Sequence, residues 1–486
     1  MMASDFIMAA ILLPLVGAAF IASSGARPNL REGYTVVFGV LLIIVVYSLA
    51  PDVLAGGRPA TQGYDVLPGL SIRFEIEPLG MLFAMVASGL WIINSLYSIG
   101  YMRGNAEPRQ TQFYTAFAVA IASTIGIAFA GNLFTLFLFY EVLTLSTYPL
   151  VTHSGKPEAV RAGRIYLGIL LTTSICFLLS GIIATYFMTG TLDFQPGGIF
   201  DPLMSATMFG VMSLLFIYGV GKAAVMPVHR WLPAAMVAPT PVSALLHAVA
   251  VVKAGVFTIV KIIVYVFGLD LFATAGSTSW VVYAAGFTVI TASVIALGQD
   301  NLKRRLAYST ISQLSYVVLA AAMATPLAVM GAALHIAAHA LGKITLFFAA
   351  GSIYTAAHKT EISQMNGIGR RMPITMIAFA IGALGMIGVP PTAGFLGKWY
   401  ILSSAMTSAD IFVLLVIFAS TLLNAAYFAP IVYNAFMKPE DVKPEHEHGE
   451  APWPIVLALS LTAAGSIALF FYPDVPLALA QQLVRS

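Results

Sequence analysis

Apolar runs of about 20 residues, each long enough to cross a membrane as a helix, recur along the whole chain. Only 9% of the 486 residues are charged and 59% are hydrophobic, whereas about a quarter of a soluble domain is charged. Backbone groups in lipid must be hydrogen-bonded within the protein, which favours helices. The sequence predicts an all-α polytopic membrane protein with about 14 transmembrane helices. They are expected near 5–23, 33–51, 78–101, 111–130, 132–152, 163–187, 206–227, 240–267, 280–298, 304–323, 326–355, 372–406, 410–436 and 452–472.

The seventh and twelfth expected helices carry matching interruptions. Glycines and Pro227 surround Lys222 in one, and Pro390 and Pro391 precede Lys398 in the other. Proline removes a backbone donor and glycine weakens a helix, so both helices are expected to be discontinuous. Paired breaks of this kind indicate inverted repeats with an ion site between them.

One transmembrane domain, 1–486, is therefore expected to contain two inverted five-helix repeats. Helices 1–3 fall in 1–110, and the first repeat, helices 4–8, in 111–267. The second repeat, helices 9–13, falls in 280–436, and helix 14 in 452–472.

Basic residues are distributed unevenly between the two sets of loops. Sixteen of the 24 lysines and arginines lie after odd-numbered expected helices, and only three lie after even-numbered ones or at the C-terminus. By the positive-inside rule, the odd-numbered loops face the cytoplasm and both termini face outward. We expect a multi-pass protein of the bacterial inner (plasma) membrane.

The sequence gives no support for a cofactor. Its single cysteine, Cys176, excludes disulfides, cysteine-ligated iron–sulfur clusters and c-type haem attachment. Nucleotide-binding glycine motifs are absent from any strand–helix context, and no nucleic-acid partner is expected. The loop 438–454 is predicted to be a solvated connector rather than a metal site at His446 and His448.

Glu141 lies near the centre of the apolar segment Gly131–Thr152, where a charge costs roughly 2.5–3.5 kcal/mol. Such an acid needs a partner, and Lys222 is the best candidate. Lys261, near a helix end, is expected to reach toward the interface with its charged tip. The five lysines within expected helices are Lys222, Lys253, Lys261, Lys343 and Lys398. The protonation of a deep lysine depends on neighbouring charges, as a proton relay requires.

Three further polar residues share one face of the eleventh expected helix. His335, His339 and Lys343 are four residues apart, and histidine can pass a proton between its ring nitrogens. A haem ligand, with His247 as its partner, and a hydrogen-bonded core histidine are the competing interpretations. His247 and Lys253 are six residues apart and are expected to face different neighbours.

Four strings together resemble the antiporter-like subunit family: the proton-pumping membrane subunits of respiratory complex I, Mrp cation/proton antiporters and membrane-bound hydrogenases. The strings are FYEVLTLSTYPLV, GKAAVMPVHRWLPAAMVAPTPVSALLHAVAVVKAG, HIAAHALGK and GVPPTAGFLGKW. The resemblance implies a hydrated axis parallel to the membrane. It implies that Glu141 pairs with Lys222, that Lys253, His339 and Lys343 continue the relay, and that Lys398 ends it.

The lysine at 398 and the chain end at Ser486 look like the D-type subunit of Mrp antiporters. The string with His247 looks more like other members, so a complex I-like or hydrogenase-type subunit is the alternative. Either assignment implies partner subunits in a hetero-oligomeric membrane complex. No catalytic chemistry is expected in the chain itself. One deep acid among lysines makes a poor sodium site, so sodium is assigned to partner subunits. A structural scaffold with inert polar residues is the third hypothesis.

Overall fold

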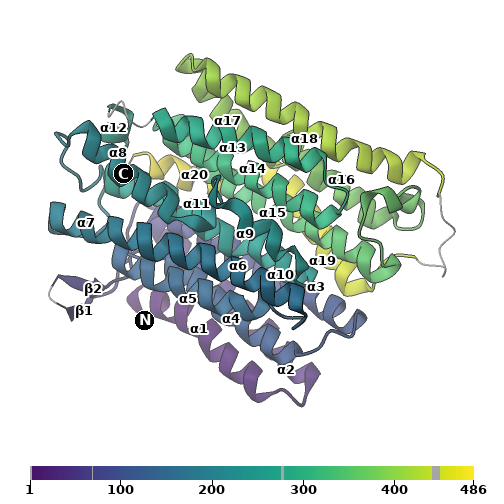
Figure 1. The fold of residues 1–486 in the computed structure, drawn as a ribbon. Coiled ribbons are helices and arrows are strands. Elements are labelled where there is room, and N and C mark those ends of the chain that lie inside the picture. The colour runs from purple at the N-terminus through teal and green to yellow at the C-terminus, as the bar shows by residue number, and fades with distance from the viewer. Residues whose placement is uncertain (1–2, 68, 275–278, 441–448, 486) are drawn as a thin grey trace.

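The structure is a computed structural model that describes residues 3–67, 69–274, 279–440 and 449–485. Figure 1 shows long helices packed side by side, with both termini at the end that carries a small β-hairpin. The helices are α1 (Ala3–Ser23), α2 (Pro28–Leu54), α3 (Pro78–Gly104), α4 (Gln110–Ala128), α5 (Leu133–Val151), α6 (Pro157–Thr173), α7 (Leu179–Thr189), α8 (Ala206–Gly219), α9 (Trp231–Ala234), α10 (Thr240–Ala244), α11 (Val251–Ile262), α12 (Leu269–Thr274), α13 (Ser279–Leu297), α14 (Leu302–Ala322), α15 (Pro326–Ala357), α16 (Pro373–Ile387), α17 (Gly394–Thr407), α18 (Ile411–Met437), α19 (Trp453–Phe471) and α20 (Asp474–Leu483).

The predicted helical membrane fold is confirmed. Within the described residues, 11 helices are long and apolar enough to span a bilayer, and α8 and α16 are shorter apolar helices. A π-helical turn, Ser174–Leu178, joins α6 to α7 into one helix. Helix α14 is not among the 11, because polar side chains lower its hydropathy. The total of 14 spans, the repeat boundaries and the orientation of the termini in the membrane stay predictions.

Both predicted helix breaks are present. Helix α8 ends at Gly219, and Lys222 lies in the following 3₁₀ turn, Gly221–Ala223. Helix α16 ends at Ile387, and α17 begins at Gly394. The backbone groups freed at the first break find partners. The indole of Trp231 donates to the Gly221 carbonyl at 3.0 Å, as buried irregular backbone requires.

Two elements were not predicted. Strands β1 (Tyr64–Leu67) and β2 (Leu70–Ile72) form an antiparallel hairpin between the second and third expected helices. Helix α20 follows the last predicted span and packs on α3 and α15. The prediction for His446 and His448 lies outside the described residues.

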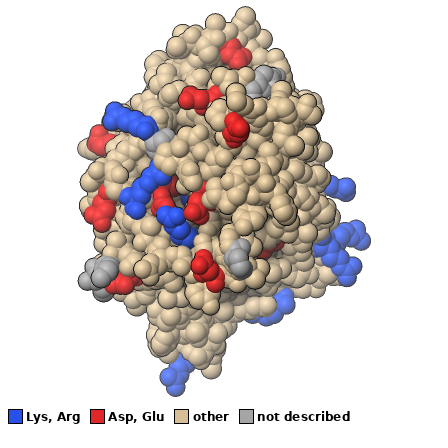
Figure 2. Space-filling model, turned by 90° about the vertical axis from the view of Figure 1, so that its left-hand side faces the viewer, with Lys and Arg blue, Asp and Glu red and all other residues tan. Residues whose placement is uncertain are grey.

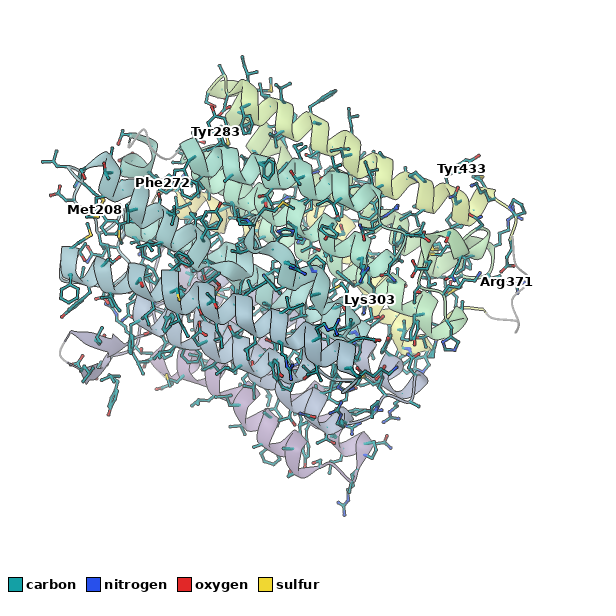
Figure 3. All side chains as sticks on the ribbon, in the orientation of Figure 1. Met208, Phe272, Tyr283, Lys303, Arg371 and Tyr433 are labelled. Carbon is teal, nitrogen blue, oxygen red and sulfur yellow. The ribbon has the colours of Figure 1, made fainter. Side chains whose placement is uncertain are left out.

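The centre of the bundle consists of the helical segment Thr240–Phe267, which contains α10 and α11, together with α15. All of the most apolar part of Thr240–Phe267 is buried, and 94% of that of α15. Figure 3 shows side chains filling the space between the helices. Polar residues on these two elements are therefore shielded from lipid by the rest of the protein.

Candidate functional site

Lys253 on α11 and His339 on α15 meet at the centre of the molecule. The Lys253 ammonium lies 2.6 Å from Nδ1 of His339, and both side chains are buried. Nε2 of His339 is buried without a hydrogen-bond partner among the described residues. One ring nitrogen thus faces the lysine while the other is free to exchange a proton.

Helix α14 supplies a polar face that the sequence interpretation missed. Ser309, Gln313 and Tyr316 recur at the spacing of one helical face, next to α15. The Gln313 amide oxygen lies 3.1 Å from Nε2 of His335, whose ring is 6.1 Å from that of His339. The sequence does indicate this polar face, because the string LAYSTISQLSYVV contains many polar residues.

Beyond His335, the row reaches Lys398. The Lys398 ammonium lies 4.9 Å from the centre of the Tyr316 ring, and it donates to the carbonyls of Met386 and Ile387 at 2.8 and 2.9 Å. Gly397 permits α17 to approach α15 closely, because a Cβ at this position would come within 2.8 Å of Cβ of His335. Helix α17 therefore lies directly against α15.

Lys343 occupies a side branch rather than the link to Lys398. Its ammonium donates to the hydroxyl of Ser309 at 2.9 Å, and the Tyr427 hydroxyl donates to the same oxygen at 3.2 Å. The stripe His335–His339–Lys343 shares one buried face of α15, as its spacing predicts.

The structure does not bring Lys222 into an ion pair with Glu141. The ammonium donates to the Tyr140 carbonyl at 2.8 Å and to the Thr144 hydroxyl at 2.6 Å, both on α5. Both carboxylate oxygens of Glu141 are buried without a hydrogen-bond partner among the described residues. Glu141, on α5, and Lys222, at the helix break, are thus neighbours. The hydrogen bonds of the lysine nevertheless go to the Tyr140 carbonyl and the Thr144 hydroxyl.

His247 lies within a π-helical turn, Leu245–Val249, next to Phe347 of α15. Turns of this kind are frequent at functional sites. Both ring nitrogens of His247 are buried without a partner among the described residues. The polar atoms of this region are far less satisfied than is usual for a protein interior.

Gly255 sets the distance between the first break and the central helices. A Cβ at Gly255 would come within 2.4 Å of the backbone of Lys222 and Ala223. Only glycine lets the broken segment lie against α11, two residues beyond Lys253. The break and the central lysine are thereby held close together.

The prediction that Lys261 reaches the interface is wrong. Lys261 is fully buried, lies 3.3 Å from the Glu77 carboxylate, and donates to the Ala130 carbonyl at 2.8 Å. Glu77 precedes α3, where its carboxylate caps the helix by accepting from the amides of Leu79 and Gly80. Glu141 is therefore not the one buried acid of the chain. Desolvating both charges is tolerable only because they are paired.

A surface network of charges covers this pair at the hairpin end. Arg73 pairs with Glu75 at 2.8 Å and Asp193 at 3.3 Å, and Arg58 lies 3.6 Å from Glu75. Figure 2 looks onto this end and shows acidic and basic side chains gathered around a hollow.

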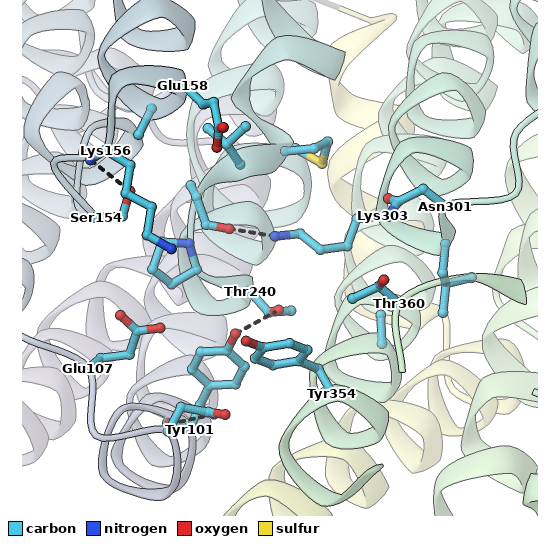
Figure 4. A pocket seen from close by; sticks show the side chains of 18 of the residues that line it. Tyr101, Glu107, Ser154, Lys156, Glu158, Thr240, Asn301, Lys303, Tyr354 and Thr360 are labelled. Atoms are coloured by element: carbon cyan, nitrogen blue, oxygen red, sulfur yellow. Dashed lines mark hydrogen bonds between the residues drawn. The ribbon is translucent and has the colours of Figure 1, made fainter. Parts of the chain in front are cut away.

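A cavity of about 530 Å³ opens at the opposite end, where the basic loops lie. Figure 4 shows Glu107 and Lys303 on opposite sides of it, with the Tyr101 hydroxyl 3.4 Å from Thr240 at the start of α10. Lys303 donates to the Ala238 carbonyl at 2.5 Å. Burial raises the pKa of Glu107, and Lys303 and Lys156 oppose that shift. Thr240, at the start of the helical segment that carries His247, lines this cavity.

His153, in the loop beside this cavity, gives a pH prediction. Burial and the nearby Arg109 lower its pKa to about 4. The unfolded chain therefore takes up a proton first as pH falls through about 6.5, and stability is lost between that pH and about 4. At pH 5 we expect a loss of about 2 kcal/mol relative to pH 7 that His153→Gln lacks.

The measurement is chemical unfolding of both proteins in detergent at pH 7 and pH 5. Glu107 titrates in the opposite sense, so the difference between the two proteins, not the slope of either, is the readout. Parallel pH dependence would show that His153 is not neutral in the fold.

The helices are long enough to span a membrane, and two of them are broken beside lysines. They surround a buried row of lysines and histidines. These features define a polytopic membrane protein of the ion-transporting kind. The chain belongs to the NADH:quinone oxidoreductase/Mrp antiporter transmembrane family, whose model matches residues 130–424. It is accordingly a membrane subunit of the proton-transporting type shared by complex I-like enzymes and Mrp antiporters.

Relatives match along most of the chain. NADH-quinone oxidoreductase subunit N of Desulforudis audaxviator is 35% identical, over 88% of this chain and 86% of its own. Subunit L of Mycobacterium tuberculosis is 30% identical, over 94% and 73%.

Solved complexes contain chains of the same fold. An archaeal membrane-bound sulfane sulfur reductase has one with a TM-score of 0.85 and 25% identity, covering 99% of this chain and 97% of that chain. The Mrp complex from Dietzia sp. DQ12-45-1b has one with a TM-score of 0.84, 20% identity and the same coverage. Chains of this fold thus occur in multi-subunit membrane complexes.

Proposed function

We propose that this chain translocates protons along the buried row of lysines and histidines. The observation that carries the proposal is the run Lys253–His339–His335–Gln313. Neighbouring groups in it are close, and one ring nitrogen of each histidine has no hydrogen-bond partner in the described part of the chain. An imidazole that accepts a proton on one nitrogen can release one from the other. Lys398 lies at one end of this run.

The other end of the row is Lys222, held by α5 next to Glu141. A negative charge near Glu141 would attract the Lys222 ammonium and draw it away from the Tyr140 carbonyl and the Thr144 hydroxyl. The backbone of Lys222 packs against Gly255, which is two residues from Lys253. A conformational change at the break would therefore alter the packing next to Lys253. The unpartnered carboxylate of Glu141 suits a position that faces a neighbouring subunit or water.

We place the chain in a multi-subunit Mrp-type antiporter that exchanges monovalent cations for protons. The lysine at 398 favours this assembly. Within the described residues, no group of three or more histidine, cysteine or acidic side chains is arranged so that it could hold a metal ion. The buried row also carries several lysines, whose ammonium groups repel cations, so we assign sodium to partner subunits.

A complex I-like or hydrogenase-type assembly is the second candidate. The 35% identity to an NADH-quinone oxidoreductase subunit favours it. In such a complex, electron transfer in partner subunits would drive the same proton row.

Transport in inside-out vesicles that contain the assembled complex tests the proposal and separates the two candidates. Acidification of the vesicles followed by sodium-dependent proton release indicates an Mrp-type antiporter; NADH- or hydrogen-driven uptake without a sodium response indicates the redox-driven assembly. In either case Glu141→Ala is expected to lower proton transport at least tenfold. Asp65→Asn, an exposed acid on β1, serves as the control. Undiminished transport by an assembled Glu141→Ala complex would refute the proposed route.

A further inference from the structure

An outward-opening groove runs along α6 and the π-helical turn that follows it. It has a volume of about 580 Å³, and Val228 and Arg230, from the segment after the first break, form its other wall. Ile165, Ile169 and Phe177 make the lining largely apolar. The groove lies on the outer surface of the bundle, apart from the lysine–histidine row.

Two arginines lie in this groove without any acid to pair with. Arg164 and Arg230 are both exposed, and neither guanidinium has a hydrogen bond or ion pair within the described part of the chain. Other arginines of the chain, such as Arg73 and Arg371, are paired with acids. Two guanidiniums beside an apolar groove favour an anionic ligand with an apolar chain, and guanidinium geometry matches phosphate oxygens.

The size of the groove decides between a lipid chain and a protein helix. From Arg164 to Phe177 the helix rises roughly 20 Å, about the depth of one bilayer leaflet with its interface. A volume of about 580 Å³ over that length leaves a cross-section of roughly 30 Å². A helix about 10–12 Å wide needs roughly 80–110 Å² and would lie over the mouth of the groove without filling it, whereas a single acyl chain fits inside.

We propose that this groove binds an anionic phospholipid, with its phosphate between Arg164 and Arg230 and one acyl chain along α6. Basic pockets between helices at the cytoplasmic end of membrane proteins recognise such headgroups. Thr173, on the groove wall, would be 2.2 Å from a Cβ at Gly221, next to Lys222. The lipid therefore lies one side chain away from the first helix break.

Native mass spectrometry of the full chain in detergent, titrated with phosphatidylglycerol or phosphatidylcholine, tests the headgroup. We expect tight retention of one phosphatidylglycerol and at least tenfold weaker binding of phosphatidylcholine. Arg164→Ala with Arg230→Ala should weaken phosphatidylglycerol binding at least tenfold. Arg161→Ala, an exposed arginine on α6 outside the groove, is the matched control. Equal binding of both lipids, or unchanged binding by the double variant, would overturn the proposal.

Filling the groove tests the acyl-chain position. Gly168 lines the groove, and a Cβ there would meet no atom within 4 Å, so the side chain of Gly168→Trp starts in open space at the groove. It should abolish retention, whereas Gly33→Trp, at an equally open helical glycine on α2, should not. Retention by Gly168→Trp would contradict the assignment even if the variants at the two arginines behaved as expected.

The assembled complex distinguishes a lipid from a partner subunit. Cys176, the only cysteine, is exposed and precedes Phe177. A spin label there should be relaxed by spin-labelled phosphatidylglycerol more than by its phosphatidylcholine counterpart. A label immobilised by protein and insensitive to both lipids would show that a subunit covers the groove instead. None of these measurements uses transport, so their outcome is independent of whether the proposed function is correct.

Discussion

Replacement of Lys253 by methionine is expected to lower proton transport by at least tenfold while the complex still assembles. Methionine matches the length and apolar stem of lysine but carries no proton. The substitution removes the group that lies 2.6 Å from His339 and so cuts the row at its centre. The measurement is the initial rate of proton movement in vesicles, followed with a pH-sensitive dye.

Lys359→Met is the matched control for this experiment. Lys359 lies in a loop, 3.7 Å from Glu440, and takes no part in the row. Its loss should leave transport within about twofold of the unmodified complex. Full activity of the Lys253→Met complex, with assembly shown by co-purification, would mean that protons take another route and that the row is structural.

Glu77→Gln is expected to destabilise the protein by about 3–5 kcal/mol, because it leaves the charge of Lys261 buried without its counter-charge. Glutamine keeps an oxygen that can cap α3, so the loss reports the pair rather than the cap. Unfolding in detergent by chemical denaturant measures it. The double variant Glu77→Gln with Lys261→Met should be more stable than Glu77→Gln alone.

Glu75→Gln provides the comparison, since Glu75 belongs to the partly exposed network at the surface. It should cost no more than about 1 kcal/mol. If the double variant were as unstable as the sum of its parts, the two charges would be acting independently. The buried pair would then not be the reason that Lys261 is tolerated in the interior.

The spacing of apolar residues was sufficient to predict the helices, because a chain in lipid has few other ways to satisfy its backbone. Glycine and proline around Lys222 and Lys398 likewise predict the breaks, since their effect on a helix is local. His335 and His339 could be placed on one face from their spacing alone. Within α15, helical spacing alone gives the alignment of these side chains that the structure shows.

Partners across helices could not be predicted, because helical periodicity fixes a face but not the neighbour of that face. Glu77 is 184 positions before Lys261, so the sequence around the lysine offers no sign of the acid. For the same reason, the Tyr140 carbonyl and Thr144 hydroxyl took the place assigned to Glu141 as hydrogen-bond acceptors of Lys222. The polar face of α14 was visible in the sequence, but its contact with His335 depends on tertiary packing.

The carbonyls that hold Lys398 are the last two of α16, and they give this lysine a counter-charge that is not a side chain. The aligned peptide dipoles of a helix place about half a negative charge at its C-terminal end. A full-length helix would have presented that end to the membrane surface, whereas the break brings it inside the bundle. These carbonyls therefore stabilise the charged form of Lys398 in the interior where no acid does so. When its proton leaves, the helix end loses its counter-ion, so proton occupancy is coupled to the geometry of the gap between α16 and α17.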